Sequence, residues 1–194
     1  KILDVVIINW FLPSQCSFII RFMFFIYNVL GFKACWWACV LGAVNGQRYL
    51  GPVLVLLYLA IHIYYLPQKS RPSEINLLLF AAFFGTLADS FLLNLGLLIY
   101  KGTTFSFLAP FWITAMWVGF TATLNHSFKG LDGKFLIQLI LGLVFGPVSY
   151  LTGVSFEAIS FSSQYPENTI LIVIALMWGI SFPLLYAASK KIKN

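Results

Sequence analysis

The chain has 194 residues, of which 60% are hydrophobic and only 9% are charged. Because soluble domains carry roughly 25% charged residues, this composition excludes an ordinary soluble protein and indicates lipid as the medium of most side chains. The formal net charge is +6, but the Lys and Arg residues fall mostly in short loops between apolar runs. We therefore expect no nucleic-acid partner.

The first 22 residues differ from the rest of the chain. Pro13, Gln15 and Arg21 interrupt their apolar character, so we expect residues 1–22 to form an N-terminal extension or interfacial segment outside the core. Met23 begins a stretch that could serve as a start in its own right. The predicted transmembrane domain therefore covers residues 23–194.

Six later segments are long and apolar enough to cross a bilayer, which takes about 20 residues of helix. Inside lipid the backbone must satisfy its own hydrogen bonds, which favours helices. The predicted spans cover residues 24–44, 49–66, 75–99, 109–128, 135–154 and 169–189. We predict an all-α fold, a polytopic membrane helix bundle of about six transmembrane helices.

The connections between these spans are short, so consecutive helices should be antiparallel neighbours, and the basic residues then collect on one side. That side carries Arg21, Lys69, Arg71, Lys129, Lys134, Lys190, Lys191 and Lys193, whereas the other carries Arg48 and Lys101 together with Glu157 and Glu167. The positive-inside rule places the more basic side, and with it both termini, in the cytoplasm.

Ionisable residues inside the spans are candidates for chemistry, because a charge at mid-helix costs roughly 2.5–3.5 kcal/mol to insert. Asp89 lies in the outer half of the third span and is a candidate catalytic or ligand-binding residue; the alternative is a structural hydrogen bond or ion pair. Lys33, in the first span, is its expected cation, unless its long side chain snorkels to the interface. We expect Asn45, Asn94 and Tyr150 to line an outward-facing polar pocket with Asp89. Together with Lys33, these four are the candidate ligand-binding residues.

Asn125 and His126 end the fourth span on the cytoplasmic side and complete the set of candidate catalytic residues. Histidine exchanges protons near neutral pH, which suits proton transfer; an interfacial histidine bonded to a neighbour is the alternative. His62 lies at a similar depth in the second span. Two histidines without an accompanying carboxylate make a weak metal site, and Asp89 is predicted to lie too far outward to join them. We therefore predict no metal ligands and no cofactor.

Gly142 and Gly146 form a GxxxG pattern in the fifth span. This spacing lets a neighbouring helix approach closely, although such patterns are also frequent by chance. We expect a packing role for the two glycines.

Four blocks of the sequence together resemble a known family. The blocks are Trp-Ala-Cys-Val-Leu-Gly-Ala at 37–43, Ala-Asp-Ser at 88–90, Thr-Leu-Asn-His-Ser at 123–127 and Gly-Pro-Val-Ser-Tyr at 146–150. They are similar to a family of small bacterial multi-pass inner-membrane proteins described as a domain of unknown function, over about residues 24–190. Lys33 stands where that family is expected to have Gln. The resemblance implies the inner membrane of a Gram-negative bacterium and a loose association with enzymes that modify fatty acids.

Three functions stay open at this point, and the residues do not decide whether the protein is an enzyme. The first is to handle, or to help modify, membrane lipid or fatty-acid groups. The second is a non-catalytic scaffold subunit of a membrane complex, in which Asp89 and His126 hold helices together. The third is a small proton-coupled transporter with an alternately protonated Asp89. The expected partners are membrane lipids and either another membrane protein or a second copy of the chain.

Overall fold

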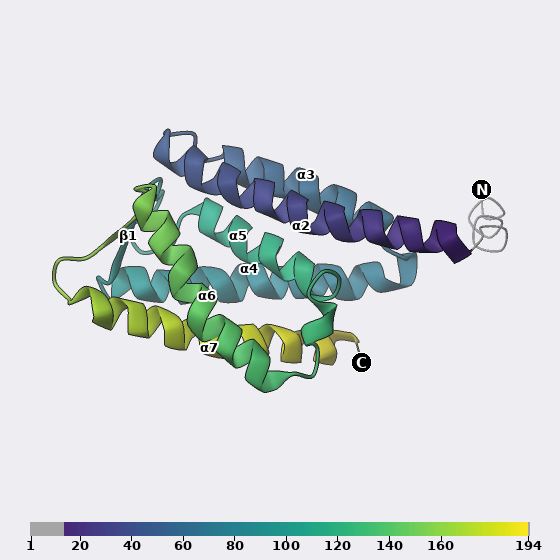
Figure 1. The fold of residues 1–194 in the computed structure, drawn as a ribbon. Helices are drawn as coiled ribbons and strands as arrows, with labels where there is room; N and C mark the ends of the chain where they lie inside the picture. The colour runs from purple at the N-terminus through teal and green to yellow at the C-terminus, as the bar shows by residue number, and fades with distance from the viewer. Residues whose placement is uncertain (1–13, 194) are drawn as a thin grey trace.

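The computed structural model describes residues 14–193, and these residues are mostly helical (Figure 1). Within them lie the α-helices α2 (Ser14–Val44), α3 (Leu50–Tyr65), α4 (Arg71–Asn94), α5 (Phe111–Leu124), α6 (Phe135–Ser155) and α7 (Glu167–Lys193). Two short 3-10 helices, η1 (Gln68–Ser70) and η2 (Lys129–Leu131), lie in the connections, and two short strands, β1 (Leu98–Tyr100) and β2 (Ile159–Phe161), pair with each other. The predicted all-α helical bundle is confirmed.

Four of the helices, α2, α4, α6 and α7, are long and apolar enough to cross a membrane, as judged by length and composition. The chain is therefore a membrane protein. α3 and α5 correspond to the other two predicted spans but have only 16 and 14 residues, or about 24 and 21 Å of helix. Pro110 precedes α5 and a turn at Asn125 ends it, so the span predicted over residues 109–128 is too long.

The short helix α5 lies at the centre of the bundle. It packs against α2, α3 and α4, and nine of its 14 residues are buried. α4 also contacts α7, and α6 packs mainly against α7, which it crosses in Figure 1. Other helices rather than lipid surround α5. The backbone N–H and C=O groups of the turns at its two ends can therefore form hydrogen bonds with protein groups.

Gly142 and Gly146 hold α6 close to α7. A Cβ atom on Gly142 would overlap the backbone carbonyl of Trp178, and a Cβ atom on Gly146 would lie 2.5 Å from the Cβ atom of the same tryptophan. Only glycine leaves room for α7 at these positions, so the packing role predicted for the GxxxG pattern is confirmed.

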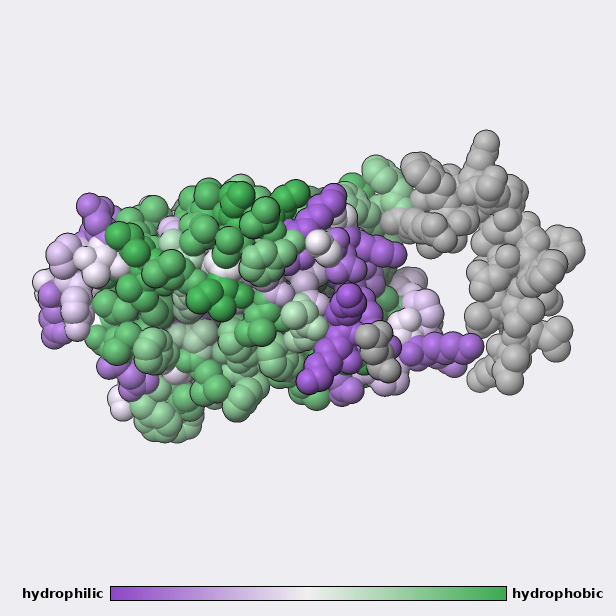
Figure 2. All heavy atoms as spheres, turned by 90° about the horizontal axis from the view of Figure 1, so that it is seen from below, coloured by the Kyte–Doolittle hydropathy of each residue, from purple (hydrophilic) through white to green (hydrophobic). Residues whose placement is uncertain are grey.

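Hydrophilic side chains gather toward the two ends of the bundle, and an apolar belt lies between them (Figure 2). We call one end the basic end. It carries the α3–α4 and α5–α6 connections and the last turn of α7, with Lys69, Lys129, Lys134, Lys190 and Lys193 exposed. We call the other the hairpin end, after the paired strands. The orientation of the basic end toward the cytoplasm stays a prediction.

At the hairpin end, β1 and β2 tie the α4–α5 connection to the α6–α7 connection. The strands are antiparallel, with Leu98 opposite Phe161 and Tyr100 opposite Ile159. α4 ends at Asn94, and Gly96 then takes a φ of +68°, a conformation that favours glycine. The span predicted over residues 75–99 therefore runs too far, because its last residues form β1.

The N-terminal helix begins earlier than predicted. α2 starts at Ser14 and runs without a break through Met23, so the expected boundary near residue 23 is not a helix boundary. The rest of the predicted extension, residues 1–13, lies outside the described residues.

Candidate functional site

A histidine–carboxylate centre, made of His62, Glu74 and His126, lies near the basic end of the bundle. His62 Nε2 is 3.2 Å from Glu74 Oε1, and His126 Nε2 is 3.4 Å from the same oxygen. One possible ligand atom from each residue lies within 4.8 Å of the other two. His62 and Glu74 are buried, whereas the His126 side chain is 19% exposed. Three titratable groups therefore converge on one buried point, and only the His126 side chain is partly exposed.

The connectivity of the helices builds this centre. His62 lies in the last turn of α3 and Glu74 in the first turn of α4. The tight connection over residues 66–70 lies between them. His62 is four residues before this connection and Glu74 is four residues after it, so the two side chains lie at a similar depth. His126 follows the C-cap of α5, and its N–H donates to the Thr123 carbonyl at 3.2 Å. Because α5 packs against both α3 and α4, this turn is held beside their connection.

Two amide side chains orient the centre. Asn125 Nδ2 donates to Glu74 Oε2 at 3.0 Å. Asn28 Nδ2, from α2, faces His62 Nδ1 at 3.5 Å. The same amide nitrogen donates at shorter range to the Tyr58 hydroxyl and the Ala122 carbonyl. The tautomer of His62 therefore follows from Glu74: an ionised carboxylate can only accept, which favours the proton on Nε2.

Three consecutive residues of the block at 123–127 contribute to the site. Asn125 bonds Glu74, His126 supplies an imidazole, and Ser127 Oγ donates to Asn28 Oδ1 at 2.5 Å. Asn125 and His126 were both predicted as candidate catalytic residues, and the structure brings them together with Glu74.

The immediate surroundings of the two imidazoles are aromatic. The rings of His62 and His126 lie 4.8 Å apart, edge to face. Phe24 of α2 stacks on His62 at 5.6 Å and meets His126 edge-on at 5.3 Å. His126 Nε2 is itself buried and makes no hydrogen bond, although it lies within ion-pair distance of Glu74. The polar groups of the centre are thus surrounded by apolar side chains.

Glu74 was missed in the sequence argument. The expectation that His62 and His126 lie at a similar depth is confirmed, but the carboxylate beside them is Glu74 and not Asp89. Connectivity is the sequence signal for this carboxylate, since a tight turn between antiparallel helices places His62 and Glu74 at the same depth. The premise that no carboxylate accompanies the histidines is therefore wrong.

A polar cavity of ≈ 270 Å³ opens beside the centre at the basic end. It is lined by Asp132, Gly133, Ser189, Lys190 and Lys193. Ser189 Oγ and Lys193 Nζ both donate to Asn125 Oδ1, and the amide nitrogen of Asn125 donates to Glu74. Hydrogen bonds therefore connect the wall of this cavity to the centre.

A second buried group, the Asp89 cluster, consists of Asp89, Tyr100, Trp117 and Tyr150. Asp89 Oδ1 accepts hydrogen bonds from the hydroxyls of Tyr100 at 2.7 Å and Tyr150 at 2.6 Å, and Oδ2 accepts one from Trp117 Nε1 at 2.6 Å. Asp89 is fully buried. The three donors come from β1, α6 and α5, so this one carboxylate links four elements of the fold.

Close packing supports the Asp89 cluster. The Trp117 ring stacks on Trp178 of α7 with ring centres 4.3 Å apart. Gly85, one turn before Asp89 on α4, makes room for Trp117, because a Cβ atom there would overlap the indole. The carboxylate is therefore enclosed by side chains and is separate from the histidine–carboxylate centre.

Of the residues predicted to share a pocket with Asp89, Tyr150 contacts it directly. Asn94 instead donates to the backbone carbonyl of Ser90 in α4, at 2.6 Å, and to that of Phe107 in the α4–α5 connection, at 2.8 Å. Asn45 is exposed and donates to a carbonyl of its own helix. Lys33 is exposed on α2, and the ion pair expected between it and Asp89 is not formed, because three neutral donors already occupy the carboxylate oxygens.

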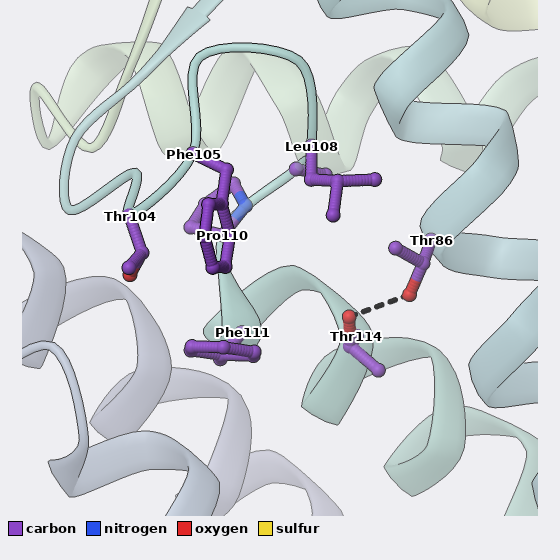
Figure 3. Close-up of a pocket in the computed structure, with 8 residues that line it drawn as sticks. Thr86, Thr104, Phe105, Leu108, Pro110, Phe111 and Thr114 are labelled. Carbon is purple, nitrogen blue, oxygen red and sulfur yellow. Dashed lines mark hydrogen bonds between the residues drawn. The ribbon is translucent and has the colours of Figure 1, made fainter.

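An apolar cavity of ≈ 210 Å³ lies beside α4, α5 and the connection between them (Figure 3). It is lined by Thr86, Thr104, Phe105, Leu108, Ala109, Pro110, Phe111 and Thr114. The hydroxyls of Thr86 and Thr114 lie 2.6 Å apart and bond each other, and Thr86 also donates to the Ala82 carbonyl. With these hydroxyls paired, the cavity presents mainly hydrocarbon surface.

The fold and the centre define a polytopic helical membrane protein with titratable groups gathered inside one end of its bundle. The chain belongs to the family described as a protein of unknown function (DUF2878), which it matches over residues 25–184. The resemblance to a domain-of-unknown-function family is therefore confirmed. Neither a curated protein nor a solved structure matches the chain.

Proposed function

We propose that the chain is a lipid-handling protein of the bacterial inner membrane. It holds an anionic lipid headgroup at its basic end and uses the histidine–carboxylate centre for proton transfer while a lipid or fatty-acid group is modified. The observation that carries this proposal is the polar cavity that hydrogen bonds connect to Glu74 through Asn125.

Charge favours an anionic headgroup in this cavity. Lys190 and Lys193 line it against the single carboxylate of Asp132, and both lysines are exposed. A basic residue near an anionic membrane surface contributes about 1 kcal/mol of attraction. The positive-inside rule puts this end in the cytoplasm, so the headgroup would belong to the cytoplasmic leaflet.

His126 is the member of the centre that a bound lipid can reach. It is partly exposed, whereas His62 and Glu74 are buried. A histidine beside a carboxylate is an arrangement suited to general acid–base catalysis, because the carboxylate orients the ring and stabilises its charged form. His126 would therefore exchange the proton, with Glu74 as the residue that positions it.

Lipid retention tests the proposal. The full chain is purified in detergent with equal amounts of phosphatidylglycerol and phosphatidylcholine, and retained lipids are counted by native mass spectrometry. We expect preferential retention of phosphatidylglycerol, weakened roughly 30-fold in the Lys190→Gln, Lys193→Gln double variant if each lysine contributes about 1 kcal/mol. Lys101→Gln, at the hairpin end, is the matched control. Equal retention of both lipids by the wild-type chain would contradict the proposal.

A scaffold role is the second candidate, and the Asp89 cluster favours it. Three donors bond that carboxylate and link four elements, as expected of a group that holds helices together. Proton-coupled transport has less support, because the buried α4 residues between Glu74 and Asp89 are apolar: Leu77, Leu78, Ala81 and Gly85.

A further inference from the structure

The histidine–carboxylate centre has the donor set of a transition-metal site. It offers two imidazole nitrogens and one carboxylate oxygen, from three different parts of the fold. A tetrahedral zinc ion with bonds of about 2.0–2.1 Å keeps its ligand atoms about 3.3 Å apart. Two of the three spacings match: Glu74 Oε1 lies 3.2 Å from His62 Nε2 and 3.4 Å from His126 Nε2. The two imidazole nitrogens lie within 4.8 Å of each other, so the rings must move closer together when an ion binds.

We propose that His62, Glu74 and His126 bind one divalent transition-metal ion, with zinc as the best-fitting species. Three protein ligands leave a fourth position open, as in catalytic rather than structural zinc sites. His126 is the one partly exposed side chain of the three, although its Nε2 atom is buried, so the open position lies in a largely buried setting. A water molecule or a substrate oxygen occupies it.

The state of His126 supports a metal over a simple hydrogen-bonded triad. Its Nε2 atom is buried and makes no hydrogen bond, and its nearest partner is Glu74 Oε1 at 3.4 Å. Both histidines also direct a ring nitrogen at the same carboxylate oxygen. A cation between the three atoms satisfies all of them at once.

Asn125 fits the needs of such a site, whereas Asn28 must rearrange. Asn125 Nδ2 already bonds the second oxygen of Glu74, which fixes the orientation of the carboxylate. Metal binding at His62 Nε2 moves the ring proton to Nδ1, which needs an acceptor such as a carbonyl oxygen. The Asn28 amide can supply one only by turning over, which gives up its hydrogen bond to the Ala122 carbonyl at 3.2 Å.

The donor set also limits which metals fit. Mg²⁺ and Ca²⁺ prefer oxygen ligands, so the two imidazoles disfavour them. Zinc and iron(II) both use two histidines and one carboxylate, and the experiment below separates them. This inference rests on the same centre as the proposed function and deepens it: with a metal bound, His126 is a ligand, and the metal-bound water takes over the proton transfer. It does not depend on a lipid, and its test contains none.

Direct metal binding tests the inference. The full chain is purified in detergent without a polyhistidine tag, because it contains only two histidines of its own. Metal content is first measured by mass spectrometry. The protein is then stripped with a chelator and titrated anaerobically with Zn²⁺, Fe²⁺ or Mg²⁺, while bound metal and thermal unfolding are followed.

We expect about one Zn²⁺ per chain, a raised unfolding temperature, weaker binding of Fe²⁺ and no effect of Mg²⁺. Tighter binding of Fe²⁺ than of Zn²⁺ would support a metal site here but would overturn the assignment of zinc as its metal.

Three variants complete the design. Glu74→Gln and His126→Gln should each weaken zinc binding by more than about 100-fold, because loss of even an outer partner costs 10- to 100-fold. Glu157→Gln, which alters an exposed carboxylate at the hairpin end, should bind like the wild type. If Glu74→Gln does not fold, His126→Gln decides, since His126 is the partly exposed ligand. Absence of saturable wild-type binding below about 100 µM zinc, or equal binding by His126→Gln, would overturn the inference.

Discussion

Glu74 and Asp89 are both buried carboxylates of α4, and their surroundings differ in kind. Asp89 accepts three hydrogen bonds from neutral donors and is enclosed. Glu74 faces two histidines and is connected through Asn125 to a polar cavity. We therefore propose a structural role for Asp89 and a chemical role for Glu74.

The structural role of Asp89 predicts a loss of stability in Asp89→Asn. An amide nitrogen cannot accept a hydrogen bond, so at least one of the three donors loses its acceptor whichever way the new side chain turns. We expect the unfolding free energy to fall by about 1–3 kcal/mol, measured by denaturation in detergent. Asp132→Asn, at an exposed site, should change it by less than about 0.5 kcal/mol. Equal stability of both variants would show that the cluster holds nothing together.

The residues that sequence reasoning found and missed follow a physical pattern. Asp89 and His126 stand out because a polar group inside an apolar run needs a reason to be there. Glu74 lies beside a charged loop, where placing a carboxylate costs little free energy, so the same reasoning does not single it out. Lys33 was paired with Asp89 on depth alone, but depth does not say which face of α2 a side chain occupies.

At the scale of the elements, small residues decide how closely helices approach. Gly146→Leu should disrupt the contact of α6 with α7, because its side chain would occupy the space of Trp178. We expect a loss of about 1–3 kcal/mol or more from such overpacking, again by denaturation in detergent. Gly130→Leu is a matched control, since nothing lies within 4 Å of a Cβ atom at that glycine. An unchanged unfolding midpoint for Gly146→Leu would contradict the close packing.

The lengths of α3 and α5 were the least predictable feature of the elements. Hydropathy extends a segment for as long as residues stay apolar, so residues 109–128 appeared to form one span. Pro110 fixes the start of α5, and the turn through Asn125 and His126 ends it. That early end delivers both residues to the centre. Likewise, apolar residues 97–99 extend the predicted third span, although Leu98 and Ile99 belong to β1, whose pairing with β2 is a long-range contact.

At the scale of the whole molecule, the number and order of the helices could be predicted, because the need to satisfy the backbone in lipid leaves few alternatives. The central position of α5 could not, since it depends on which helices pack together rather than on any one segment. Hydropathy and loop length therefore predict the helices of the fold. The histidine–carboxylate centre depends in addition on the packing of α5 against α3 and α4, which brings His126 to Glu74.

Orientation in the membrane is also a property of the whole molecule. We expect Lys134→Cys, at the basic end, to be shielded from a membrane-impermeant maleimide in intact cells. Gln164→Cys, at the hairpin end, should react. Both are made in a background in which the three native cysteines are replaced. The physical reason is that positively charged loops are retained in the cytoplasm. Labelling of Lys134→Cys alone would reverse the orientation and move the headgroup to the opposite leaflet.

The central claim is that the histidine–carboxylate centre carries the function and the Asp89 cluster carries the fold. The most direct test compares His126→Gln with Asp89→Asn in cells that lack the native gene, measuring the membrane lipid profile per amount of folded protein. We expect wild-type amounts of His126→Gln with an altered lipid profile, and reduced amounts of Asp89→Asn with a normal profile per folded chain. A wild-type lipid profile in the His126→Gln cells, with the variant present at normal amounts, would contradict it.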